Sequence, residues 1–201
     1  MHARLVTITG TDVDAAVRFL NEKVAPVASK QKGFRQLAAS GDRSRGVVSI
    51  VSVWESKGDL EASDSAIAKL RQEGVGSFGG QATVGVFEQV VWEIAATPPQ
   101  PGCSLRLVTY KVDPSRVEDN IAWFKSSVLP AIMATPGIRA VRNLVDRETG
   151  EGRVGTVFSD RASLDAAADT RARLMAAAKD RGIEFGEDAI LEVLYARMAA
   201  S

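Results

Sequence analysis

The pattern of apolar and polar positions along the first half of the chain alternates between strand-like and helix-like segments. "ARLVTITG" (3–10) is a β-rich opening. "FRQLAAS" (34–40) and the apolar run 47–55 are two further strands, joined by the turn-like "GDRSRG". "TVGVFEQVVWEI" (83–94) is a last strand. Before the second strand, apolar residues recur at helical spacing at Val13, Val17, Leu20 and Val24. With a second helix after residue 56, this half is predicted to be β-α-β-β-α-β.

The second half of the chain repeats this order. "RLVT" occurs at 4–7 and again at 106–109, and "VAPVASKQKGFR" (24–35) matches "VLPAIMATPGIR" (128–139) with a shift of about 104 residues. "VWESKGDLEA" matches "VFSDRASLDA" in the same way, so that Ser56 and Asp160 are equivalent helix N-caps. We therefore expect a repeat over 1–94, a Pro-rich linker over 95–104 and a second repeat over 105–201.

A β-α-β-β-α-β unit is the ferredoxin-like motif. The strand at 47–54 is apolar on both faces, with Val51 and Val53 on one face and Ile50 and Trp54 on the other. Helices can cover one face, and the sheet of the other repeat is the expected cover for the second. The fold class predicted is α+β, with two tandem ferredoxin-like repeats that form an intramolecular dimeric α+β barrel.

Two segments resemble a known family. "VWESKGDLEASDSAIAKL" (53–70) is similar to the strand-into-helix segment of the antibiotic biosynthesis monooxygenase family, in the dimeric α+β barrel superfamily. "VLPAIMATPGIRAV" (128–141) resembles its first-helix-to-second-strand segment. The resemblance implies the barrel fold and, for some members, oxygenation of aromatic compounds without a cofactor. Other members degrade haem or bind small ligands.

Composition and charge narrow the function classes. Lys plus Arg and Asp plus Glu both number 25, so the chain lacks the basic surplus that a nucleic acid or anionic membrane partner favours. One cysteine and one histidine, His2, offer neither a metal cluster nor the haem ligand of the resembling family. We expect no cofactor and no metal. No apolar run is long enough for a membrane span and no signal peptide is visible, so a cytoplasmic location is expected. Richness in Ala, Val and Arg is typical of a GC-rich bacterial source.

Four residues are candidates for a ligand site. Trp54 is either a pocket wall or a core residue at a strand end, as Phe158 is in the second repeat. Arg171 lies within the apolar stripe of its helix and there requires a buried carboxylate or an anionic ligand, unless it extends to solvent from the edge of the stripe. Asp64 lies at the border of its stripe, at a pocket rim or in solvent. Tyr110 either orients a ligand or ends its strand.

Phe19 and Trp123 are equivalent in the two repeats. At 100° per residue both fall far from the apolar stripe of their helices, which suggests that a second subunit of a homodimer or the linker covers these faces. If the helices are rotated from this assignment, both side chains belong to the core.

These observations predict a protein that binds a small hydrophobic or aromatic molecule without established catalysis. The alternative is a cofactor-independent monooxygenase of the antibiotic biosynthesis type, acting on an aromatic substrate. No residue stands out as a general base, which favours the binding protein.

Overall fold

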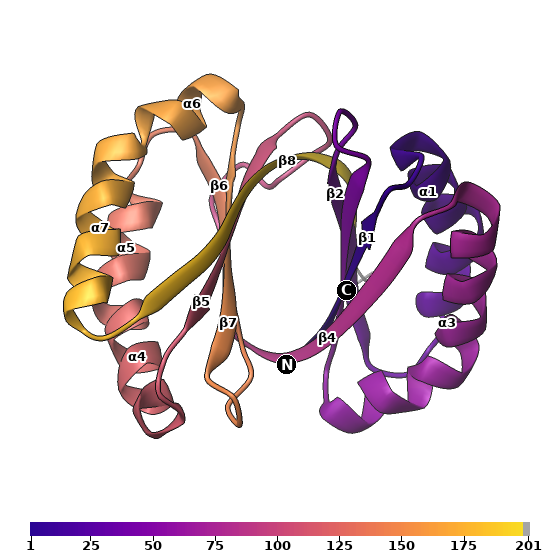
Figure 1. The fold of residues 1–201 in the computed structure, drawn as a ribbon, viewed down its shortest axis with the longest axis horizontal. Helices are drawn as coiled ribbons and strands as arrows, with labels where there is room; N and C mark the ends of the chain where they lie inside the picture. Colours follow the sequence, from indigo (N-terminus) through magenta and orange to yellow (C-terminus); the bar gives the residue numbers. More distant parts are fainter. Residues whose placement is uncertain (199–201) are drawn as a thin grey trace. The chain divides into compact units, whose positions relative to one another are not determined.

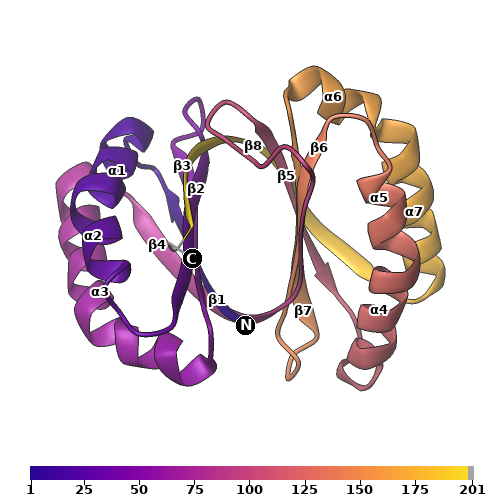
Figure 2. The same cartoon turned by 180° about the vertical axis from the view of Figure 1, so that it is seen from behind.

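The computed structural model describes residues 1–198, which divide into two compact units. The N-terminal unit comprises Met1–Phe87 and the chain from Glu192 onward, and the C-terminal unit comprises Glu88–Leu191. Each unit is an α+β structure with helices on one face of an antiparallel sheet (Figures 1 and 2). The alternation expected from the sequence is therefore confirmed in both.

The strands of the N-terminal unit are β1 (His2–Thr9), β2 (Phe34–Asp42) and β3 (Val47–Trp54), together with the first part of β4 (Gln81–Ile94) and the end of β8 (Glu184–Met198). Their order is β4-β1-β3-β2-β8. The hairpin between β2 and β3 turns at Gly46, whose φ of +61° favours glycine. Gln36 to Gly41 of β2 pair with Met198 to Glu192 of β8, so the end of β8 completes this sheet.

The strands of the C-terminal unit are β5 (Ser104–Lys111), β6 (Ile138–Val145) and β7 (Glu151–Phe158), flanked by the first part of β8 and the end of β4. Their order, β8-β5-β7-β6-β4, repeats that of the other unit. Glu88 to Ile94 of β4 pair with Val145 to Ala140 of β6. Each unit thus takes one sheet edge from a strand that begins in the other.

The first helix of each unit is interrupted by a π-helical turn. In the N-terminal unit α1 (Val13–Phe19) continues through the turn Leu20–Val24 into α2 (Ala25–Ala28). In the C-terminal unit the short 3₁₀ turn Pro114–Arg116 and α4 (Val117–Trp123) lead through the turn Phe124–Val128 into α5 (Leu129–Met133). A π turn places more residues in each turn than an α-helix, so it changes the face that the preceding residues present.

The remaining helices begin where the sequence predicts. Ser56 Oγ accepts the Asp59 N–H at 3.1 Å and caps α3 (Lys57–Phe78), and Asp160 Oδ1 accepts the Ser163 N–H at 2.8 Å at the start of α6 (Arg161–Ala166). A short helix break separates α6 from α7 (Ala168–Asp180). Within the described residues the helices are too short or too polar to span a bilayer.

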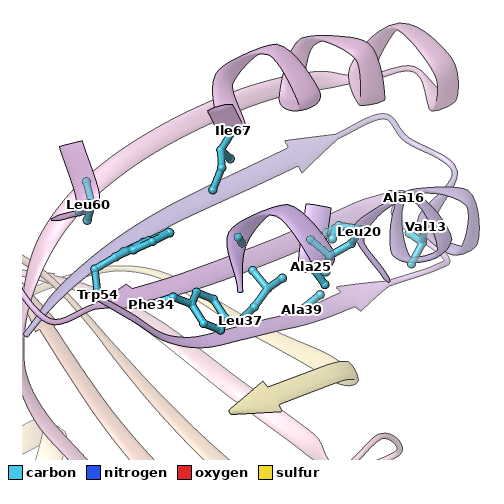
Figure 3. Close-up of a cluster of buried hydrophobic side chains, with 12 residues drawn as sticks. Val13, Ala16, Leu20, Ala25, Phe34, Leu37, Ala39, Trp54, Leu60 and Ile67 are labelled. Carbon is cyan, nitrogen blue, oxygen red and sulfur yellow. The ribbon is translucent and has the colours of Figure 1, made fainter. Parts of the chain in front are cut away.

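Side chains between helices and sheet form the core of each unit. In the N-terminal unit the cluster includes Leu20, Phe34, Leu37, Trp54 and Leu60 (Figure 3). In the C-terminal unit two clusters form, one around Phe124, Phe158 and Leu164 and the other around Tyr110 and Val145. In each unit a cavity remains between this layer of helices and the sheet.

Candidate ligand sites in the two units

The C-terminal unit contains the larger of the two cavities, at about 130 Å³. Its walls are mostly apolar and come mainly from β5, β7, β8 and the helices, among them Val108, Trp123, Phe124, Val154, Phe158, Leu174 and Phe185. A dry apolar cavity of ~150 Å³ accepts a benzene molecule. The space therefore suits a ligand with a single aromatic ring.

The π turn helps to shape this cavity. Trp123, Phe124 and Val128 all line it, and all lie at or within the turn Phe124–Val128. Arg181 lies over the Trp123 ring, 5.0 Å from the ring centroid, and the indole is half-buried. In the N-terminal unit Phe19, Leu20 and Val24 line the other cavity in the same way. π turns are frequent at functional sites because they re-aim side chains.

The outward orientation of Phe19 and Trp123 expected from a regular helix is therefore wrong. Phe19 packs edge-to-face on Phe78 with centroids 5.8 Å apart, and Trp123 lines the cavity of its own unit. The apolar stripes extend into the π turns at Val24 and Val128, where the step of 100° per residue fails. Phe19 and Trp123 are both half-buried. The homodimer stays a prediction that these two side chains no longer support.

Tyr110 lies on β5 and is a wall of the C-terminal cavity. Its hydroxyl donates to Asn143 Oδ1 at 2.9 Å, and both side chains are buried. Burial raises the pKa of Tyr110 to about 12, although the Asn143 hydrogen bond and the charge of Arg153 act in the opposite direction. Gly152 lies opposite on β7, where a Cβ would come within 2.1 Å of the Tyr110 ring. Glycine at this position therefore makes room for the phenol.

Arg171, on α7, also lines the cavity and forms an ion pair with Asp188 of β8 (Nη1 to Oδ2, 3.3 Å). Arg106, from β5, binds the same carboxylate through Nε and Nη2, at 2.7 and 3.1 Å. The carboxylate partner that Arg171 requires is thus a residue of the chain. Two arginines share one carboxylate, which leaves a net positive charge beside an apolar cavity.

Asn120 is a lining residue that the sequence analysis did not identify. Its side chain is buried, and its Oδ1 has no hydrogen-bond partner among residues 1–198. The Nε of Arg171 is likewise buried without a partner within that range. Unpaired buried polar groups are costly, and a ligand can supply the missing bonds. The cavity accordingly offers an acceptor at Asn120 and a donor at Arg171.

Trp54 does not line either cavity. Its side chain is 0% exposed, its indole N–H donates to Ser52 Oγ at 3.1 Å, and it packs edge-to-face on Phe34 (Figure 3). Phe158, at the equivalent position, does line the cavity of its unit. The structure places Trp54 as a core residue, and a role for it in binding stays a prediction.

The N-terminal cavity is smaller, at about 60 Å³. Arg4 and Arg71 are among its walls, and both form ion pairs with Oδ1 of Asp64, at 3.2 and 3.0 Å. The Asp64 side chain is 51% exposed, so it lies at the rim of the cavity rather than in its lining. The sequence did not identify Arg4 as a candidate site residue, and it did not indicate that the Arg4 side chain is buried.

Metal binding has no evident basis in the described chain. Residues 1–198 contain no group of three or more His, Cys, Asp or Glu side chains arranged to hold a metal ion. Cys103 is buried and not in a disulfide.

Comparison with known proteins places this geometry in context. No protein-family model matches the sequence. Two relatives from Mycobacterium tuberculosis H37Rv are the uncharacterized proteins Rv2557 and Rv2558. The first is 29% identical over 79% of this chain and 71% of its own length. The second is 26% identical over 99% of this chain and 84% of its own.

Solved structures share the fold over nearly the whole chain. An anthrone oxidase-like protein matches with a TM-score of 0.68 and 15% identity, covering 100% of this chain and 94% of its own. An uncharacterized ferredoxin-fold protein from Listeria monocytogenes, related to antibiotic biosynthesis monooxygenases, matches with a TM-score of 0.57 and 8% identity, covering 96% and 95%. These likenesses show that the chain shares its α+β, ferredoxin-like fold with these solved structures, which is the kind of fold that the resemblance implies.

Proposed function

We propose that the protein binds a small, hydroxylated aromatic molecule in the cavity of the C-terminal unit. The observation that carries this proposal is the combination of an apolar cavity of about 130 Å³ with the unpartnered Oδ1 of Asn120. A ring of phenol size fills the space, and its hydroxyl donates to the amide oxygen. Arg171 supplies a donor for a carbonyl or other acceptor on the same ring.

Phenol is a suitable first probe, with toluene as its counterpart without a hydroxyl. Isothermal titration of both should show saturable binding, with phenol the tighter ligand. Asn120→Leu removes the acceptor and should weaken phenol binding about tenfold while changing toluene binding little. Equal losses for the two probes would show that Asn120 does not bind the hydroxyl.

A matched pair of substitutions tests which unit carries the site. Val154 on β7 and Ile50 on β3 occupy equivalent repeat positions and line the larger and the smaller cavity, respectively. Val154→Trp should fill the C-terminal cavity and abolish binding of phenol, whereas Ile50→Trp should leave it intact. If the second substitution alone abolishes binding, the site lies in the N-terminal unit. Circular dichroism confirms that each variant folds.

The alternative function is cofactor-independent oxygenation. The observation in its favour is the positive charge of Arg106 and Arg171 beside the cavity, which can stabilise a phenolate or an enolate. In such a reaction a ring CH₂ and O₂ become a ring carbonyl and water. Oxygen consumption with anthrone, compared between the wild type and Arg171→Gln, tests this activity.

Two features favour binding over oxygenation. Among the described residues that line the cavity, none is a histidine or a carboxylate, and the phenol of Tyr110, with its raised pKa, is protonated at neutral pH. A base to deprotonate the substrate is therefore not evident in the lining. In addition, a cavity for one ring is small for a substrate with three fused rings.

The proposal extends to the organisation of the chain. We infer a tandem duplication, with repeats at 1–94 and 105–201 joined by the linker 95–104, and an intramolecular barrel formed by the two repeats. The matching strand orders, the matching π turns and the exchange of the strand ends of β4 and β8 support it. A cytoplasmic location is part of the same proposal.

A further inference from the structure

The N-terminal unit contains a second polar cluster, built from Arg4, Ser63, Asp64 and Arg71. The Arg4 side chain is 4% exposed, and its Nη2 donates to the Leu60 carbonyl oxygen at 2.8 Å. Its Nη1 donates to Ser63 Oγ at 3.2 Å. The Asp64 Oδ1 accepts a hydrogen bond from Arg71 Nη2 and forms an ion pair with Arg4 Nη2. One carboxylate oxygen thus serves two guanidinium groups.

The charges of this cluster do not cancel. Arg4 and Arg71 contribute two positive charges and Asp64 one negative charge, so a net positive charge stays beside the cavity. Asp64 is half exposed, which screens its charge, whereas Arg4 is buried. Arginine does not lose its proton under ordinary conditions, so a buried guanidinium is compensated by an anion rather than by deprotonation.

One donor in the cluster is unused. Arg71 Nη1 is buried and has no hydrogen-bond partner within residues 1–198. Arg71 and Arg4 both line the cavity of about 60 Å³, whose other walls are mainly apolar, including Leu20, Ile50 and Ile67. A dry cavity that accepts a benzene molecule measures ~150 Å³, so this space is less than half of that size. It suits an anion of three or four heavy atoms and is too small for an aromatic ring.

The two units therefore present the same charges around cavities of different size. Arg4 and Arg106 occupy the same position of the repeated "RLVT" segment, and each shares a carboxylate with an arginine of a helix. The carboxylate comes from α3 in one unit, at Asp64, and from β8 in the other, at Asp188. Asp64 and Asp188 do not occupy equivalent positions of the repeat. Duplication of the chain therefore does not by itself explain why both units have two arginines that share one carboxylate.

We propose that Arg4 and Arg71 form a binding site for a small monocarboxylate, of the size of formate or acetate, in the N-terminal unit. The carboxylate accepts the free Nη1 of Arg71 and lies against the apolar wall, and its charge neutralises the excess of the cluster. This site is independent of the proposed aromatic site of the C-terminal unit, and neither proposal depends on the other.

The test follows the side-chain resonances of the arginines by NMR during titration with sodium acetate. Sodium gluconate, whose anion is too large for the cavity, keeps the ionic strength constant. We expect a saturable shift of the Arg71 resonance with acetate and with formate, and none with benzoate. Arg71→Gln should weaken acetate binding at least about tenfold, as expected for the loss of a hydrogen bond to a charged group.

Arg35→Gln is the matched control, because it removes one positive charge from an exposed ion pair with Glu55 in the same unit. It should leave acetate binding unchanged. If both variants weaken acetate binding equally, the effect comes from the loss of one positive charge anywhere in the unit, and the proposal is overturned. An Arg71 resonance that does not respond to acetate would also overturn it. A saturable shift of the Arg71 resonance with benzoate, at an affinity equal to that of acetate, would overturn the assigned ligand size. Arg71→Lys, which keeps the charge but loses the planar fork, provides a folded variant if Arg71→Gln does not fold.

Discussion

Tyr110 of β5 and Asn143 of β6 form a buried hydrogen bond of 2.9 Å across β7, the strand between them in the sheet of the C-terminal unit. The phenol also lines the cavity. The Asn143 side chain is 0% exposed, so solvent cannot replace the phenol as its partner. The pair therefore contributes both to stability and to the shape of the cavity.

Tyr110→Phe removes this bond and leaves Asn143 Oδ1 unsatisfied. Leaving a buried acceptor without a donor costs about 1–3 kcal/mol. We expect the free energy of unfolding, measured by urea denaturation, to fall by that amount. Tyr195→Phe removes the hydroxyl of the other tyrosine in the chain and should have a smaller effect. Losses of equal size would mean that the hydrogen bond contributes little.

The raised pKa of Tyr110 predicts a loss of stability in alkali. The ordinary value is 10.0 and the folded-state pKa is about 12, so the folded state favours the neutral phenol. The stabilisation is fully present below the ordinary value and is lost as the pH rises toward the folded value. Ultraviolet difference absorbance should show one tyrosine that ionises late, and this step should be missing in Tyr110→Phe. A late step that persists in this variant would assign it to Tyr195.

Asp188→Asn should alter the charge preference of the larger cavity. The substitution leaves Arg106 and Arg171 without their shared carboxylate, so the positive charge beside the cavity increases. Benzoate should then bind more tightly than to the wild type, by about tenfold, whereas benzyl alcohol should bind as before. Isothermal titration of both probes measures the difference. A parallel gain for the neutral probe would indicate a change in cavity shape instead.

Trp54→Phe separates a role in the core from a role in binding. The indole is fully buried and hydrogen-bonded to Ser52, so its replacement should lower the free energy of unfolding by about 1–3 kcal/mol. Phenol binding in the C-terminal unit should not change. Weaker phenol binding with an unchanged free energy of unfolding would show that Trp54 takes part in binding.

Local signals in the sequence were sufficient for much of the fold. Ser56 and Asp160 cap helices through their own side chains, and Gly46 occupies a turn that favours glycine, so neighbouring residues determine these features. The π turns were missed because the apolar spacing of Val13, Val17 and Leu20 is compatible with a regular helix. Pro26 and Pro130, which lack an N–H and follow the two turns, are the signals that were available.

The candidate site depended more on tertiary structure. The position of Arg171 within an apolar stripe left a carboxylate, a ligand and an extension to solvent as alternatives. Asp188 lies on a strand that helical periodicity cannot place beside Arg171. Asn120 lies in a helix, and the sequence gives no hint that its Oδ1 is buried without a partner among residues 1–198. For Trp54, both interpretations were compatible with the end of a strand, and only the packing against Phe34 distinguishes them.

The pairing of β2 with the end of β8 has a consequence for the order of events during synthesis. Residues 36–41 leave the ribosome long before residues 192–198, with which they pair. Domains ordinarily fold from the N-terminus as the chain emerges. Here the N-terminal unit keeps an open sheet edge until the whole of the C-terminal unit has been translated, so the part of the protein made first is the part finished last.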